Sequence, residues 1–119
     1  MEDDIDVLKK LNVQIGETET VGDAAARAWF ERTLAPTLAF RRADLTTFDD
    51  RAAFLGKIKP SDRRDTAVQT VDVIGDAAFV KCVVTVRAAA GDKRYRNLRL
   101  FVRDAAREWR LLGWANEPV

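Results

Sequence analysis

The sequence predicts an α+β fold, with three helices first along the chain and a curved, mainly antiparallel sheet after them. Two observations indicate this class. Apolar residues recur at intervals of three and four up to about residue 58, whereas from Thr66 onward they recur at every second position. Short turns rich in Gly, Ala and Asp separate the later segments, and strands joined by short turns pair antiparallel. Helices packed on one face of a sheet satisfy both patterns.

The first two helices follow from their apolar spacing and their end signals. The first begins within residues 3–4, where acidic side chains suit the positive end of the helix dipole, and it ends near Gly16 or continues to Thr20. The second begins after Asp23, whose carboxylate can cap the first N–H groups. It is expected to stop at 35–36, an Ala-Pro pair, because proline interrupts a helix.

A short strand is predicted over 37–45 and a third helix over 47–58, capped by Asp49 or Asp50. The rest of the chain alternates with period two. Four further strands are expected at 66–74, 77–88, 94–104 and 108–116.

The 119 residues are the size of a single domain, predicted to span 1–119. No apolar run approaches the roughly 20 residues that a membrane-spanning helix needs. The acidic start MEDDIDVLKK lacks the basic-then-apolar order of a secretory signal, and the single cysteine, Cys82, excludes an intrachain disulfide. We therefore expect a cytoplasmic protein without a membrane partner.

Charge is unevenly distributed, although the net charge is only +1. Acidic residues gather in the first 23 residues, and arginines gather in 87–110. A basic face of this kind suits nucleic acid or an anionic ligand; alternatively, the two ends attract each other within the fold or across a dimer. Nucleic-acid-binding modules are usually basic throughout, so we expect no nucleic acid partner.

The chain contains no histidine. This excludes Ser-His-Asp and Cys-His catalysis and removes the commonest zinc and non-haem iron ligand, which one cysteine cannot replace. We expect no metal and no other cofactor. Acid–base chemistry would have to use a carboxylate, Tyr95 or a lysine with a displaced pKa.

Two stretches, VDVIGDAAFVKCVV at 71–84 and REWRLLGWAN at 107–116, carry a resemblance to a known family. Together with the element order, they resemble the nuclear transport factor 2-like superfamily, in its SnoaL-like and ketosteroid-isomerase-like branch. The resemblance implies a cone of helices and curved sheet with a pocket at its wide end, and a homodimer formed through the sheet. Apolar residues on both faces of the predicted strands agree with a covered outer face.

In the resembled isomerases a carboxylate base lies on or after the first strand, assisted by a tyrosine. This chain reads AFRRAD there, and alternation places Arg42, a cation, where the base is expected. Tyr95 is not on a helix, and the histidine that dehydratases of this fold use is absent. The carboxylates nearest to a catalytic role are Asp44 and Asp72, so the sequence favours a binding domain over an enzyme.

Arg42 and Arg99 each allow two interpretations. Inside an apolar cone, a guanidinium group would suit a carboxylate or phosphate ligand. Otherwise Arg42 lies at the rim, over Phe40 or paired with Asp44, and Arg99 pairs with Asp72 across strands or faces the dimer.

The tryptophans divide in the same way. Trp29 and Trp109 fit a core position, whereas Trp114 and Asn116 near the chain end are candidates for the pocket mouth that the resemblance implies. The candidate pocket residues are Trp29, Phe40, Arg42, Arg99, Trp114 and Asn116.

Three functions are therefore compared. The first is a homodimeric domain that binds a small hydrophobic or acidic ligand in the cone. The second is a cofactor-free isomerase or cyclase acting on a hydrophobic carbonyl compound, which requires Asp44 or Asp72 to face the cavity. The third is a protein association module.

Overall fold

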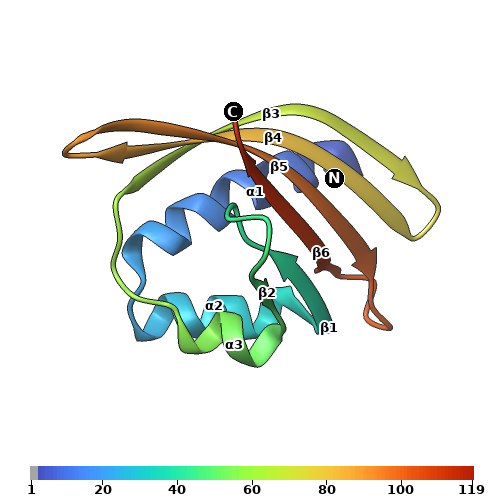
Figure 1. Ribbon diagram of the computed structural model, residues 1–119. Coiled ribbons are helices and arrows are strands. Elements are labelled where there is room, and N and C mark those ends of the chain that lie inside the picture. Colours follow the sequence, from blue (N-terminus) through green and yellow to red (C-terminus); the bar gives the residue numbers. More distant parts are fainter. Residues whose placement is uncertain (1–2) are drawn as a thin grey trace.

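The computed structural model describes residues 3–119 (Figure 1). Its helices are α1 (Asp4–Val21), α2 (Ala24–Thr33) and α3 (Arg51–Gly56). Its strands are β1 (Leu34–Arg41), β2 (Phe48–Asp49), β3 (Arg63–Ile74), β4 (Ala77–Ala88), β5 (Gly91–Arg103) and β6 (Trp109–Pro118). None of the helices in this part of the chain is both long and apolar enough to cross a membrane.

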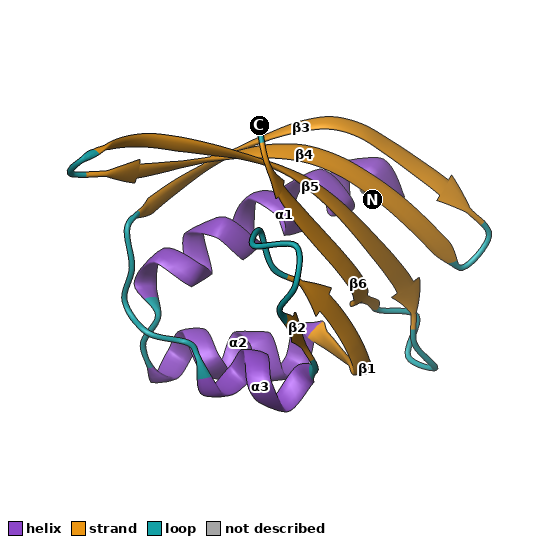
Figure 2. Cartoon of the chain, in the orientation of Figure 1, coloured by secondary structure: helices purple, strands orange, loops and turns teal. Residues whose placement is uncertain are grey.

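One six-stranded sheet, ordered β2-β1-β6-β5-β4-β3, forms the body of the protein. Neighbouring strands are antiparallel except β1 and β6, which run parallel. The sheet is strongly curved and the helices lie on its concave side (Figure 2). The register shifts at two places, which adds to the bend. One extra residue lies in β3 between Val68 and Thr70, and another lies in β6 between Leu111 and Gly113. The predicted α+β class with a mainly antiparallel sheet is confirmed.

Helix α1 continues past Gly16 to Val21, so the longer predicted end is the better one. Asp3 caps its first turn by accepting a backbone N–H. Gly22 ends the helix in the left-handed conformation with φ 55°, and a Cβ at this position would collide with the backbone of Lys59. Glycine therefore lets the end of α1 pass close to the segment that leads into β3.

The start of α1 contacts the sheet where β5 ends and β6 begins. The Asp4 carboxylate forms an ion pair with Arg103 and accepts a hydrogen bond from Trp109 Nε1 at 3.2 Å. The Arg103 guanidinium lies 4.2 Å from the centroid of the Trp109 ring. At this contact, the acidic N-terminal segment and the basic C-terminal third attract each other within the fold, as one of the two interpretations of the charge pattern predicted.

The predicted end of α2 is wrong. The helix ends at Thr33, and β1 already begins at Leu34, which pairs with Leu111 of β6. Pro36 lies within β1 at the place where the register with β6 is irregular. Proline has no N–H to donate to a neighbouring strand, so within a sheet it is tolerated where the pairing is irregular, as it is here. Pro36 therefore belongs to a strand and is not the signal that ends the helix.

The third helix is shorter than the predicted 47–58 because its first residues form a strand. Phe48–Asp49 is β2, in which Asp49 pairs with Phe40 of β1. Asp50, and not Asp49, caps α3 by accepting the N–H of Ala53 at 2.8 Å. Asp49 is thereby left to form ion pairs on the concave side.

Candidate functional site

A cavity of about 250 Å³ lies on the concave side, between the end of α1 and strands β1, β4, β5 and β6. We call it the cone cavity. It is lined by Glu19, Phe40, Arg42, Ala43, Arg64, Val84, Val86, Tyr95, Asn97, Arg99, Trp114 and Asn116. Five of the six residues predicted for a pocket are in this set, and Trp29 is the exception. A smaller recess of about 160 Å³ adjoins it and shares Glu19, Arg42 and Arg64.

Two stacked aromatic rings form the floor of the cone cavity. Phe40 and Trp114 are paired across β1 and β6, and their ring centroids are 4.1 Å apart at an interplanar angle of 15°. Phe54 of α3 packs against both rings. The Trp114 indole Nε1 donates a 2.7 Å hydrogen bond to Asn97 Oδ1, which fixes the ring orientation.

Arg99 is fully buried, and its side chain forms part of the cavity wall. Its guanidinium donates to Asn12 O and Asn12 Oδ1 at 3.2 and 3.1 Å and to Asn97 Oδ1 at 3.3 Å, and it lies 4.8 Å from the Trp114 centroid. These partners are all neutral, and its Nε has no partner among the described residues. Burial therefore lowers the pKa of Arg99. The predicted alternative of a cross-strand pair with Asp72 is wrong, because Asp72 is exposed on the convex face.

Arg42 lies at the rim, with 32% of its side chain exposed. Its guanidinium is 4.7 Å from the Phe40 centroid, so the expected position over that ring is confirmed. Its Nε donates at 2.6 Å to Asp49, and not to Asp44 as the other interpretation supposed. Asp49 also accepts from Lys57 Nζ at 2.7 Å. Burial alone would raise the pKa of Asp49, but the hydrogen bonds from Lys57 and Arg42 outweigh it and hold this pKa below its ordinary value.

Glu19 is the functional candidate that the sequence prediction missed. It lies in the last turn of α1 with 16% of its side chain exposed, and its carboxylate is 3.8 Å from Arg64 Nε. Burial raises the pKa of Glu19 in spite of the nearby arginines. The signal was present, because Glu19 follows the buried Ile15 by four residues, on the face that α1 turns toward the sheet.

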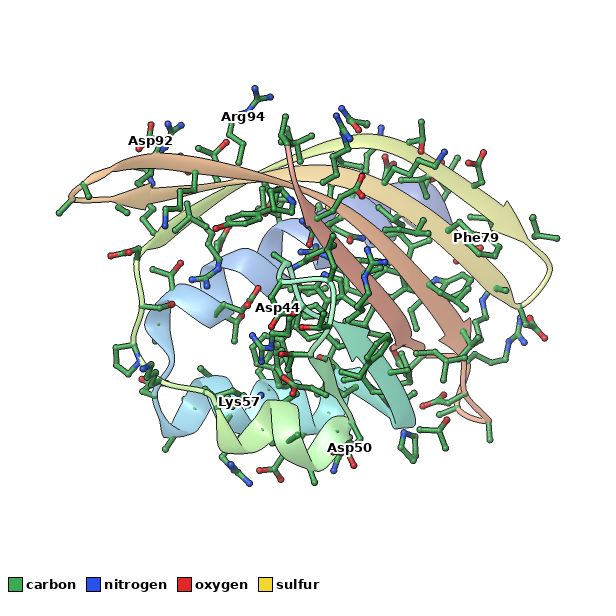
Figure 3. All side chains as sticks on the ribbon, viewed as in Figure 1. Asp44, Asp50, Lys57, Phe79, Asp92 and Arg94 are labelled. Carbon is green, nitrogen blue, oxygen red and sulfur yellow. The ribbon has the colours of Figure 1, made fainter. Side chains whose placement is uncertain are left out.

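The two carboxylates predicted as catalytic candidates lie outside the cone cavity. Asp44 is exposed in the β1–β2 loop (labelled in Figure 3), where it accepts hydrogen bonds from Thr46 and Thr47. The hydroxyl and backbone N–H of Thr47 and the backbone N–H of Thr46 lower the pKa of Asp44 to about 2. Asp72 lies on the opposite face of the sheet. Neither residue meets the condition that the isomerase or cyclase hypothesis required.

Trp29 lines a different depression, a groove of about 1060 Å³ between α1, α2 and the β5–β6 turn. Two arginines of this groove are already engaged by the protein: Arg51 donates to Glu31 O at 2.7 Å, and Arg110 pairs with Asp104 at 2.8 Å. The cone cavity differs because one of its arginines, Arg99, is fully buried and has only neutral partners. It is therefore the better candidate for a ligand site.

No protein-family model matches the sequence, and no curated protein matches it significantly. Solved structures do match over almost the entire chain. An NTF2-like protein from Cytophaga hutchinsonii has a TM-score of 0.79 and 14% identity, covering 99% of this chain and 100% of the other. An NTF2-like protein of unknown function from Silicibacter pomeroyi has a TM-score of 0.76 and 19% identity, covering 97% and 95%. The CaMKII hub of S. rosetta has a TM-score of 0.75 and 20% identity, covering 100% and 99%. The chain therefore has the nuclear transport factor 2-like fold, as the resemblance implied.

Proposed function

We propose that this protein binds a small molecule carrying a carboxylate group in the cone cavity. The observation that supports this proposal most directly is the charge of the lining, in which three arginines, Arg42, Arg64 and Arg99, face one carboxylate, Glu19. A guanidinium is a fixed cation whose planar set of donors matches a carboxylate in geometry. In a partly enclosed site of low dielectric constant, this excess of positive charge favours an anion.

The size and the floor of the cavity limit the rest of the ligand. A volume of about 250 Å³ is slightly smaller than the usual range for drug-sized ligands, roughly 300–1,000 Å³. The stacked rings of Phe40 and Trp114 add apolar surface directly beside the guanidinium groups of Arg42 and Arg99. This combination suits a compact organic acid with a short apolar portion, and it supports the small-ligand hypothesis over a catalytic use of Asp44 or Asp72.

The test is an NMR titration of ¹⁵N-labelled protein with acetate and benzoate, with acetamide and benzamide as neutral counterparts of the same shape. We expect the carboxylates to shift the indole N–H resonance of Trp114 saturably, and the amides to leave it nearly unchanged. Equal responses to acids and amides, or no response to any of the four, would overturn the proposal.

A pair of adjacent residues provides a matched control. Arg64→Gln removes a cavity cation and is expected to weaken benzoate binding about tenfold or more, since a charge-assisted hydrogen bond contributes about 1.5–3 kcal/mol. Arg63→Gln changes the neighbouring arginine, which is 74% exposed and absent from the cavity lining, and should leave the affinity unchanged.

We propose in addition that two copies associate through the convex face of the sheet. This face carries a shallow groove of about 400 Å³ lined by Ala39, Arg41, Phe48, Phe79, Leu98, Leu100, Gly113, Trp114 and Ala115. Phe48, Phe79 and Leu98 are 71%, 40% and 43% exposed, which is costly for large apolar side chains that have no partner. The likeness to a CaMKII hub agrees with an assembling fold. Sedimentation velocity over a range of concentrations should give the mass of a dimer; a monomer at every concentration would reject this second proposal.

A further inference from the structure

We propose that the cone cavity binds its anionic ligand with Glu19 in the acid form, so that ligand binding and uptake of one proton from water occur together. This inference rests on the proposed carboxylate-binding function. It assigns to Glu19 the role of a hydrogen-bond donor that distinguishes a carboxylate ligand from a neutral one.

The position of Glu19 is fixed by the backbone around it. Ser61 Oγ donates to Glu19 O at 2.9 Å, and Ser61 N donates to Thr20 O at 3.2 Å. Thr20 Oγ1 in turn accepts the Arg64 N–H at 3.1 Å. The end of α1 is thus joined by hydrogen bonds to the start of β3 and to the segment just before it, and these bonds hold the backbone of Glu19 at the cavity wall.

The surroundings of the carboxylate favour its neutral form over its charged form. Glu19 lies in the last turn of α1, at the negative end of the helix dipole, and that turn contains no basic residue. Its carboxylate accepts no hydrogen bond from the described residues; its closest cation is Arg64, at 3.8 Å. Burial outweighs the attraction of Arg64, Arg99 and Arg42, which agrees with the raised pKa of Glu19.

The charged and titratable groups that face Glu19 come from several elements. The cone cavity also contains Arg42, just after β1, Arg64 on β3, and Tyr95 and Arg99 on β5. Lys57 and Lys59 share the adjoining recess with Glu19. No second carboxylate lines either space. Proton uptake is therefore assigned to Glu19, because it is the one carboxylate among the described residues that line these two spaces.

A bound carboxylate ligand shifts the protonation equilibrium of Glu19 toward the acid form. It takes hydrogen bonds from the arginines that now stabilise the Glu19 anion, and it places a second negative charge beside that anion. Two carboxylates that share one site hold a proton between them, because both cannot be ionised at short distance. A protonated Glu19 can then donate its O–H to the ligand carboxylate.

Because a proton is taken up on binding, the affinity for the carboxylate ligand should fall as pH rises. Between the pKa that Glu19 has in the free protein and the higher pKa that it has in the complex, each pH unit should weaken binding by up to about tenfold, since one proton is taken up for each ligand bound. Above the pKa in the complex no proton is taken up, and the affinity should level off. Below the pKa that Glu19 has in the free protein, the affinity should no longer change until the ligand itself is protonated. A neutral ligand should show no such slope.

The test follows the Glu19 carboxyl ¹³C resonance against pH, with and without saturating acetate, at constant ionic strength. Glu19→Gln assigns the resonance. The inference expects a titration midpoint that acetate moves upward and that acetamide leaves in place. If acetate shifts the Trp114 indole N–H while the Glu19 midpoint stays fixed, the inference fails and the carboxylate site remains. If acetate and benzoate shift neither signal, the proposed function itself fails.

Two variants on α1 provide an independent readout. Glu19→Gln imitates the protonated side chain and should bind benzoate with an affinity that does not change over the pH range in which the unaltered protein shows its slope. Glu17→Gln alters an exposed glutamate outside the cone cavity and should retain the pH slope of the unaltered protein. The same slope in both variants would overturn the inference.

Discussion

Strand β5 carries two kinds of surface on alternate residues. Asn97 and Arg99 are buried on the concave side, in a network that includes Asn12 and Trp114. Leu98, between them, is 43% exposed on the convex side. Since side chains alternate across a strand, one segment of chain supplies a polar cavity wall and an apolar outer face. The two faces of β5 can therefore be altered separately, by substitutions at neighbouring positions.

The largest effect is expected on the convex face. Leu98→Asp places a charge in the proposed interface, and twofold symmetry introduces this charge twice. The dissociation constant of the dimer should therefore rise by about 1,000-fold or more. Sedimentation velocity measures this change. Ile5→Asp is the control, because Ile5 is also 43% exposed but lies in the first turn of α1. Benzoate binding by the Leu98→Asp monomer should persist; its loss would show that the two faces are not independent.

The next effect concerns the concave face. Arg99→Ala removes a fully buried side chain and the donor of Asn12 Oδ1, and it leaves Asn97 Oδ1 with Trp114 Nε1 alone, so the free energy of unfolding should fall by about 3 kcal/mol. Urea denaturation followed by tryptophan fluorescence measures the loss. Arg96→Ala, on the same strand with its side chain 62% exposed, should cost less than about 0.5 kcal/mol. Equal losses of unfolding free energy in the two variants would contradict the claim that the concave face of β5 is structural and its convex face is not.

A smaller effect is expected where β2 joins the cavity rim. Asp49→Asn weakens the charge-assisted hydrogen bonds from Arg42 and Lys57 and should cost about 2 kcal/mol. Asp50→Asn changes the adjacent helix cap and should be nearly neutral, because asparagine caps as well as aspartate. The folded-state pKa of Asp49 is depressed, so its contribution is present above the ordinary aspartate pKa and is lost as pH falls through the folded value. Unfolding at several acidic pH values should show this loss only when Asp49 is present.

The smallest expected effect is a change in the slope of stability against pH. The raised folded-state pKa of Glu19 means that its contribution is full below the unfolded value of about 4.5 and is lost as pH rises through the folded value. Glu19→Gln should remove this decline, so the variant gains stability relative to the unaltered protein as pH increases. Thermal unfolding from pH 4 to 8 tests the sign. A variant that loses stability with increasing pH would mean that the pair with Arg64 outweighs burial.

The sequence predicted the elements whose pattern is local. The start of α1, the Asp23 cap of α2 and the four long strands all follow from spacing and end signals. The end of α2 and the strand β2 could not be predicted in this way. Pro36 and Asp49 have their roles because β1 pairs with β6 and β2, and such pairing joins residues that are distant in the chain.

The candidate site shows the same division. Arg99 and Trp114 were found because aromatic and charged residues on late strands are conspicuous. Glu19 was overlooked because the end of the first helix was left open between Gly16 and Thr20, and only the longer helix places this glutamate in a last turn that faces the sheet. The Arg99 partners Asn12 and Asn97 are ordinary polar residues, and only the curvature of the sheet over α1 brings them together.

Native mass spectrometry of the protein incubated with benzoate tests the division of function between the two faces most directly, because it reports assembly and ligand content together. We expect the unaltered protein to be a dimer that retains up to one benzoate for each chain. We expect the Leu98→Asp variant to be a monomer that still retains one benzoate. A monomeric protein that binds no more benzoate than benzamide would contradict both assignments.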